Sequence, residues 1–93
     1  MSEVRVLLVD DHPVVRAGLR AMLTRFEGIS IAAEASDGKA ALKELARLTA
    51  LGEGPDVVLM ALQMGEGMDG VTATAEIRKL PAPPPVLILT TYD

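Results

Sequence analysis

Three short runs rich in Val, Leu and Ile constrain the fold more than any other feature of this sequence. They occupy residues 4–9, 57–60 and 86–90, and each is nearly continuous in apolar side chains. A strand with one wet face alternates apolar and polar residues, whereas a strand inside a parallel sheet is buried on both faces. A weaker strand is expected at residues 29–33. The sequence therefore predicts a parallel sheet.

Residues with helical spacing separate these predicted strands. The first helix is expected to begin at Pro13, because proline is favoured in the first turn, and to end before Gly28. Its predicted buried face comprises Val15, Leu19, Met22, Leu23 and Phe26. A second helix is expected after Gly38 and a third after Asp69, a good N-cap residue. Strands that alternate with helices form βαβ units, so the predicted fold class is α/β.

The composition excludes several classes of protein. Thirteen acidic residues against nine basic ones, a net charge of −4, argue against a surface that binds nucleic acid. The absence of cysteine excludes disulfides and thiolate metal sites. The first residues lack the pattern of a signal peptide, and no apolar run approaches the roughly 20 residues of a membrane span. We therefore expect one cytoplasmic domain that contacts neither nucleic acid nor membrane.

The residues that directly follow the predicted strands form the candidate site, because open parallel sheets bind ligands beyond the carboxyl ends of their strands. Asp10 and Asp11 follow the first strand, Ala61 the third, and Thr90 and Thr91 the end of the fourth. Two adjacent carboxylates repel each other, and a hard cation such as Mg²⁺ would relieve that repulsion. Alternatively, Asp10 is partly exposed and Asp11 only caps the first helix.

Four segments together resemble the receiver domain of bacterial two-component response regulators. They are VLLVDDH at 6–12, PDVVLMA at 55–61, MDG at 68–70 and VLILTT at 86–91. The segments DDHPVVRAGL and LTTYD are most similar to the NarL/FixJ (LuxR-type) branch. This resemblance covers the whole chain and implies an N-terminal receiver domain of a transcriptional regulator, not an enzyme.

The resemblance also implies a fold and a domain boundary. The expected fold is flavodoxin-like, an open doubly wound parallel sheet with strand order 2-1-3-4 that is truncated after the fourth strand. Residues 1–93 would then be a partial receiver domain without the fourth helix, the fifth strand, the fifth helix and the DNA-binding effector domain. The fourth strand would form an exposed apolar edge, so we expect self-association or strand exchange through it.

The resemblance assigns a role to each site residue. Asp11 would bind Mg²⁺ directly, Asp10 largely through water, and the backbone carbonyl of Gln63 would be the third protein ligand. Ala61 occupies the position of the phosphoacceptor aspartate, which takes a phosphoryl group from a sensor histidine kinase. Thr90 matches the switch hydroxyl that bonds the phosphoryl group.

Ala61 is the main departure from the family pattern. A methyl group cannot attack phosphorus or bind a metal, so we expect a chain that cannot be phosphorylated and that binds Mg²⁺ weakly. The intact surroundings favour a substituted aspartate over a natural pseudo-receiver that acts as a phosphate-independent interaction module. A phosphatase of the haloacid type would need Asp-x-Asp, but the third position here is His12.

The first predicted helix is the expected docking element for the kinase. Arg16, Arg20 and Arg25 form a basic strip on it. A solvated helix face is the alternative interpretation of the same strip.

Overall fold

The computed structural model describes residues 3–62 and 68–89 and confirms an α/β fold. Its elements are β1 (Val4–Val9), α1 (Pro13–Leu23), β2 (Ile29–Ala35), α2 (Gly38–Ala50), β3 (Val57–Ala61), α3 (Gly70–Arg78) and β4 (Val86–Leu89). All strand pairs are parallel, and the sheet order is β2-β1-β3-β4. This order confirms the prediction from the resemblance. The predicted strands end close to the observed ones, except that β2 extends to Ala35.

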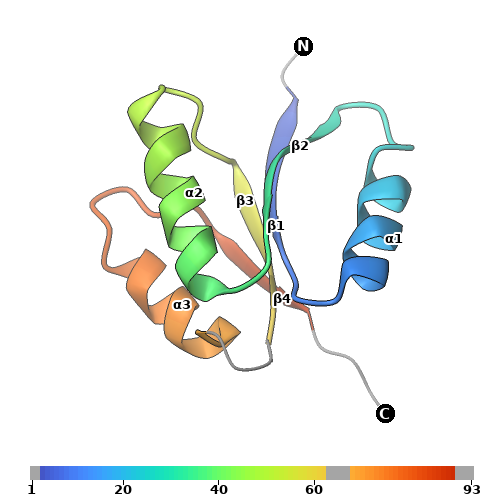
Figure 1. Ribbon diagram of the computed structural model, residues 1–93. Helices are drawn as coiled ribbons and strands as arrows, with labels where there is room; N and C mark the ends of the chain where they lie inside the picture. Colours follow the sequence, from blue (N-terminus) through green and yellow to red (C-terminus); the bar gives the residue numbers. More distant parts are fainter. Residues whose placement is uncertain (1–2, 63–67, 90–93) are drawn as a thin grey trace.

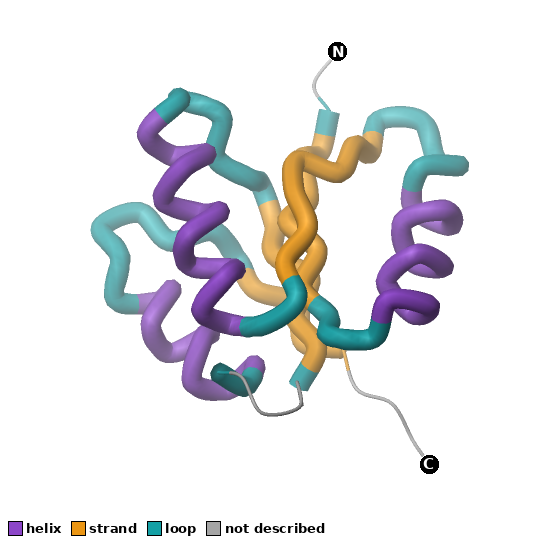
Figure 2. The backbone as a smooth tube through the Cα atoms, viewed as in Figure 1, coloured by secondary structure: helices purple, strands orange, loops and turns teal. Residues whose placement is uncertain are grey.

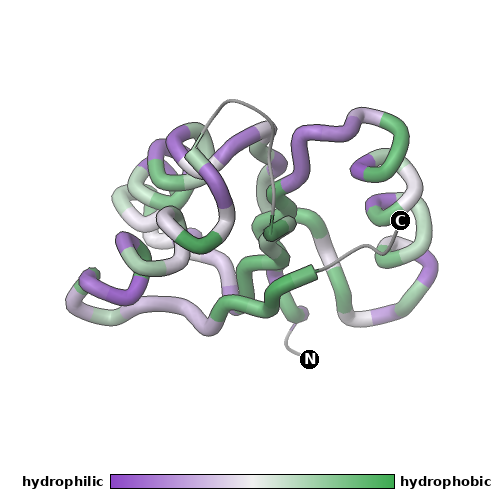
Figure 3. Tube along the Cα trace, turned by 90° about the horizontal axis from the view of Figure 1, so that it is seen from below, coloured by the Kyte–Doolittle hydropathy of each residue, from purple (hydrophilic) through white to green (hydrophobic). Residues whose placement is uncertain are grey.

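The sheet lies between two layers of helices. Helices α2 and α3 cover one face and α1 covers the other (Figures 1 and 2). Leu7, Val9, Val58 and Met60 pack with the buried side chains of α2 and α3, whereas Val6, Leu8 and Leu59 pack toward α1. Successive strand residues point to opposite faces, so both faces need apolar residues. Figure 3 shows the resulting hydrophobic strands between the two layers.

The predicted buried face of α1 is partly wrong. No residue of α1 is fully buried, and Val15, Met22 and Phe26 are 41%, 52% and 60% exposed. Only Leu19 and Leu23 pack against the sheet. With a rotation of 100° per residue along the helix, Leu19 and Leu23 lie at one side of the predicted buried face. The helix is thus rotated so that this side contacts the sheet, and the other side of the predicted buried face is left exposed.

The predicted end of α1 also differs from the structure. The helix ends at Leu23, where Thr24 is the C-cap residue. Gly28 lies beyond it with φ = +85°, in the turn that leads into β2, and its carbonyl accepts a hydrogen bond from the Val4 N–H. Glycine is favoured there because it adopts positive φ without a steric penalty. Phe26 therefore lies outside the helix, which accounts for its exposure.

Candidate functional site

The carboxyl ends of β1 and β3 bring Asp10 and Ala61 to the same edge of the sheet. Val9 of β1 is paired with Met60 of β3. The next residues along these two strands are Asp10 and Ala61, which were predicted as site residues. Asp10 is 5% exposed and Ala61 is 8% exposed. The Asp10 N–H donates to the Ala35 carbonyl at 3.1 Å, which extends the sheet to this position. A buried carboxylate and a buried methyl group therefore end adjacent strands.

Asp10 and Asp11 do not take the two roles of the alternative interpretation. Asp10 is buried, and its Oδ1 accepts a hydrogen bond from the His12 backbone N–H at 2.7 Å. His12, not Asp11, is the N-cap residue of α1, and its side chain makes no capping hydrogen bond. The carboxylate of Asp11 is thus not used to cap the helix, and the acidic pair needs another explanation.

The acidic pair has carboxylate oxygens that could act as ligands of a hard cation. His12 Nδ1 lies 2.8 Å from Asp11 Oδ1, an ion pair when the imidazole is protonated, and 3.2 Å from Asp10 Oδ1. Within residues 3–62 and 68–89, Asp11 Oδ1 is buried and makes no hydrogen bond. Asp10, Asp11 and His12 each offer one ligand atom, and these atoms lie within 4.8 Å of one another. Mg²⁺ is bound through one or two carboxylates and retains several waters. The residues present fit such an ion.

The start of α3 lies directly against the end of β3. The Gly70 N–H donates to the Leu62 carbonyl at 3.0 Å. A Cβ at position 70 would overlap the carbonyl oxygen of Ala61 and lie 3.1 Å from Leu62 Cα. The first helical residue of α3 must therefore be glycine for the helix to approach the site this closely. This contact fixes the position of the backbone of Ala61.

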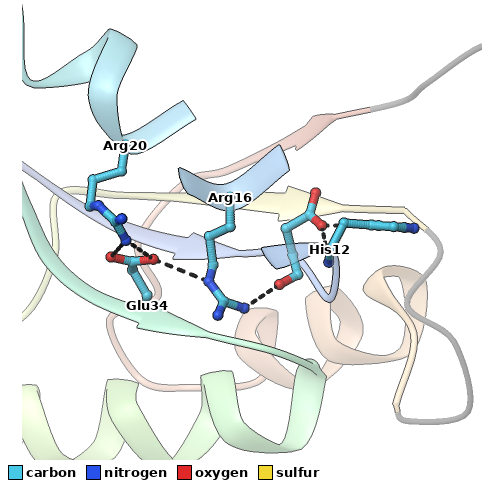
Figure 4. A network of polar contacts seen from close by, with 5 residues as sticks. His12, Arg16, Arg20 and Glu34 are labelled. Atoms are coloured by element: carbon cyan, nitrogen blue, oxygen red, sulfur yellow. Dashed lines mark hydrogen bonds and ion pairs between the residues drawn. The ribbon is translucent and has the colours of Figure 1, made fainter. Parts of the chain in front are cut away.

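A second group of charges lies beside the acidic pair, and in it two of the three arginines of the predicted basic strip are ion-paired and not fully solvated, as the alternative interpretation had them. Arg16 donates through one terminal nitrogen to the Asp10 carbonyl at 2.7 Å and through Nε to Glu34 at 3.1 Å. Arg20 donates to both Glu34 oxygens at 3.0 and 2.8 Å. Figure 4 shows Glu34 in contact with both guanidinium groups. Among these arginines, only Arg25 belongs to no ion pair found within residues 3–62 and 68–89.

Sequence reasoning did not identify Glu34 as part of this region. The available signal was its charge within β2, where the other residues are Ile, Ala and Ser. A charged residue in a half-buried strand requires a partner, and two arginines one turn apart on the neighbouring helix can provide it. Gln63 and Thr90, the two remaining predicted site residues, lie outside the described residues.

The match to a family model decides the classification. A model described as the response regulator receiver domain matches residues 6–93. This chain belongs to that family. It is a receiver domain of a response regulator in two-component signalling. Receiver domains generally bind Mg²⁺ at their acidic phosphorylation site and interact with sensor histidine kinases.

Several relatives match the receiver over nearly its whole length. The transcriptional regulatory protein LiaR of Bacillus subtilis (strain 168) is 43% identical over 89 residues, which are 96% of this chain and 39% of LiaR. A protein-glutamate methylesterase/protein-glutamine glutaminase of Alkalilimnicola ehrlichii is 38% identical over 92 residues, 98% of this chain and 22% of that protein. A LuxR-family response regulator from an Aurantimonas species has a solved structure with a TM-score of 0.84 and 36% identity, covering 99% of this chain and 61% of that one.

The relatives that contain a matching region differ in their named functions. Most are response regulators, and one is named as a methylesterase, so the receiver domain occurs in both transcriptional regulators and enzymes. The receiver spans well under half the length of LiaR. In the described part of the chain, no helix combines the length and the apolar composition needed to cross a membrane.

Proposed function

We propose that Asp10 and Asp11 hold a divalent cation, together with the backbone carbonyl of Gln63, and that Ala61 occupies the phosphoacceptor position. The observation that carries this proposal is the buried Asp10 carboxylate next to an Asp11 oxygen that makes no hydrogen bond to any other described residue. Both lie at the strand end that neighbours Ala61. Thr90, one residue beyond β4, would supply the hydroxyl that bonds a phosphoryl group.

Ala61 makes this receiver a module that cannot form an aspartyl phosphate. Its methyl group has no lone pair to attack phosphorus, and no proton removal can activate it. Because alanine replaces aspartate at position 61, the cation site has one carboxylate fewer. The affinity for Mg²⁺ is therefore lower than in a receiver with aspartate at this position. A bound divalent cation would neutralise charge on phosphoryl oxygens at this edge of the sheet. Asp10 and Asp11 supply the negative charge that holds it.

The test restores the missing carboxylate. The full-length protein with Ala61→Asp and the unsubstituted full-length protein are incubated with acetyl phosphate and Mg²⁺, and intact mass is measured. We expect the mass of one added phosphoryl group on the variant alone, and its loss when Asp11→Asn is combined with Ala61→Asp. Phosphorylation of the unsubstituted chain, or none on Ala61→Asp, would contradict the proposal.

The exposed surface of α1 is the proposed docking face for a sensor histidine kinase. Arg16 and Arg20 are already paired with Glu34, so the proposed basic contact is Arg25, which lies two residues beyond the end of α1 and not on the helix as predicted. The exposed apolar residues Val14 and Met22 supply contact area on the same helix. In an Ala61→Asp background, Met22→Glu should slow phosphotransfer from a cognate kinase. Leu51→Glu, at an equally exposed position after α2, is the control and should not.

The open edge of β4 is the proposed surface for self-association. Leu87 and Ile88 are 56% and 37% exposed, and β4 pairs only with β3 within the described sheet. An exposed apolar edge strand is a template for pairing with another chain. We expect concentration-dependent sedimentation that Ile88→Lys suppresses and Leu51→Lys does not. A monodisperse monomer of the unsubstituted chain would contradict this.

The output of the whole protein is proposed from its relatives. LiaR is named as a transcriptional regulatory protein, and the Aurantimonas structure is of the LuxR family. We propose that residues 1–93 form part of the receiver of a cytoplasmic transcriptional regulator, whose DNA contacts are made by another domain. Footprinting of promoter DNA with and without that domain in the full protein tests this proposal.

A further inference from the structure

The Arg16 side chain links the acidic pair to Glu34 of β2, in addition to the hydrogen bond from the Asp10 N–H to the Ala35 carbonyl. This side chain contacts the Asp10 carbonyl at 2.7 Å and Glu34 at 3.1 Å. The Arg16 backbone N–H donates to the His12 carbonyl at 2.8 Å. The two carbonyls that Arg16 binds therefore belong to the residues on either side of Asp11. The bond to the His12 carbonyl is a main-chain bond of α1, whereas the guanidinium is what joins the Asp10 carbonyl to Glu34 (Figure 4).

These contacts are strong enough to position the pair. Hydrogen bonds from a guanidinium are charge-assisted and about twice as strong as neutral ones. The Arg16 side chain is only 23% exposed, so water competes weakly for it. Glu34 holds the other side of the guanidinium and is itself fixed by Arg20. The orientation of Asp10 and Asp11 is thus tied to β2 and α1.

We infer that Arg16 is a positioning residue for the Asp10–Asp11 pair. Its guanidinium fixes the Asp10 carbonyl, at the peptide bond that joins Asp10 to Asp11, so that the two carboxylates are held ready for a cation. This inference rests on the proposed cation site for its effect on binding. The ordering of the backbone by Arg16 does not depend on that site, so the two can be tested separately.

Two explanations of how Arg16 acts on cation binding, repulsion by its charge and positioning of the carboxylates, predict changes of opposite sign. A guanidinium beside a cation site repels the cation, so its removal should raise the affinity. Positioning predicts that removal lowers it, because the carboxylates lose their fixed geometry. Groups that orient metal ligands typically change metal affinity by about 10- to 100-fold when mutated. The sign of the change therefore distinguishes the two explanations.

The first measurement uses metal-free protein. We expect Arg16→Gln to raise the amide hydrogen exchange of His12, whose N–H donates to Asp10 Oδ1, by about tenfold or more, while amides within β3 exchange as before. Arg16→Lys keeps the charge but can reach fewer acceptors, so it should give an intermediate rate. Unchanged exchange at His12 would overturn the inference whether or not the chain binds a cation.

The second measurement is titration with Mn²⁺, in which the electron paramagnetic resonance signal of the free ion reports binding. We expect Arg16→Gln to weaken binding by about tenfold or more. Arg47→Gln is the matched control, because it removes an arginine paired with Glu44 on α2 and should leave binding unchanged. Equal or tighter binding by Arg16→Gln would overturn the inference. Absence of Mn²⁺ binding by the unsubstituted chain would overturn the cation site instead, and hydrogen exchange would then decide the role of Arg16.

Discussion

The contact between α3 and the end of β3 predicts opposite effects for two glycine-to-alanine substitutions. A Cβ at Gly70 would overlap the Ala61 carbonyl oxygen and lie 3.0 Å from the Ala61 carbonyl carbon. Both are backbone atoms, which cannot rotate away as a flexible side chain would. Overpacking of this kind costs about 2 kcal/mol. Displacement of α3 would also weaken the hydrogen bond from the Gly70 N–H to Leu62, a further loss of about 1 kcal/mol.

The helix propensity of alanine offsets part of this cost. Alanine is better than glycine by about 1 kcal/mol inside a helix, so the expected net loss for Gly70→Ala is about 2 kcal/mol. Gly18 provides the control, because it lies within α1 and a Cβ there would meet no atom within 4 Å. Gly18→Ala should therefore gain about 0.5 to 1 kcal/mol.

Urea denaturation followed by circular dichroism measures both changes in the free energy of unfolding. With a slope of about 1 kcal/mol per M, the midpoint of Gly70→Ala should fall by about 2 M, while that of Gly18→Ala should rise. If Gly70→Ala is as stable as the unsubstituted chain, α3 does not pack on the Ala61 backbone as described. Equal effects of the two substitutions would show that helix propensity, and not the contact, decides the outcome.

Three further predictions concern the caps and the core. Asp37→Ala removes the side chain that accepts from the Ala40 N–H at the start of α2 and should cost about 1 kcal/mol in urea denaturation. The hydrogen bond from the Thr72 N–H lowers the pKa of Asp69, so the ionised carboxylate stabilises the fold fully above its unfolded pKa and progressively less as pH falls through its lowered folded pKa. In thermal melts, lowering the pH below about 4 should therefore decrease the stability of Asp69→Asn less than that of the unsubstituted chain. Leu7→Ala, at a fully buried position, should cost about 3 kcal/mol, and a loss below 1 kcal/mol would contradict the described core.

The sheet could be predicted from the sequence because its strands are buried on both faces. A continuous apolar run such as VVLMA in β3 fits the centre of a parallel sheet, and α3 begins at the predicted Asp69 cap. The strand order came from the resemblance, since periodicity alone does not say which strands are neighbours. The structure confirms that order.

The orientation of α1 could not be predicted in the same way. Its apolar residues span more of the helix surface than the sheet covers, and periodicity does not say which part will be buried. The ion pairs of Arg16 and Arg20 with Glu34 lie on the side that turns toward β2. Long-range pairs between a helix and a strand depend on the docked geometry, which a single sequence does not encode locally. Val15 and Met22 remain exposed as a result.

The candidate site was predictable in its residues but not in their supports. Strand ends are fixed by the runs of apolar residues, so the nearness of Asp10 and Ala61 follows from the topology. The burial of Asp10 was not expected from the residues alone, because a carboxylate after a strand is usually solvated. The carbonyl of Asp10 is bound by Arg16, and its carboxylate by the His12 N–H. Asp10 is thus buried and held at two points beside the Ala61 methyl group, and this is why we expect a carboxylate restored at position 61 of the full-length protein to be phosphorylated if the proposed site is correct.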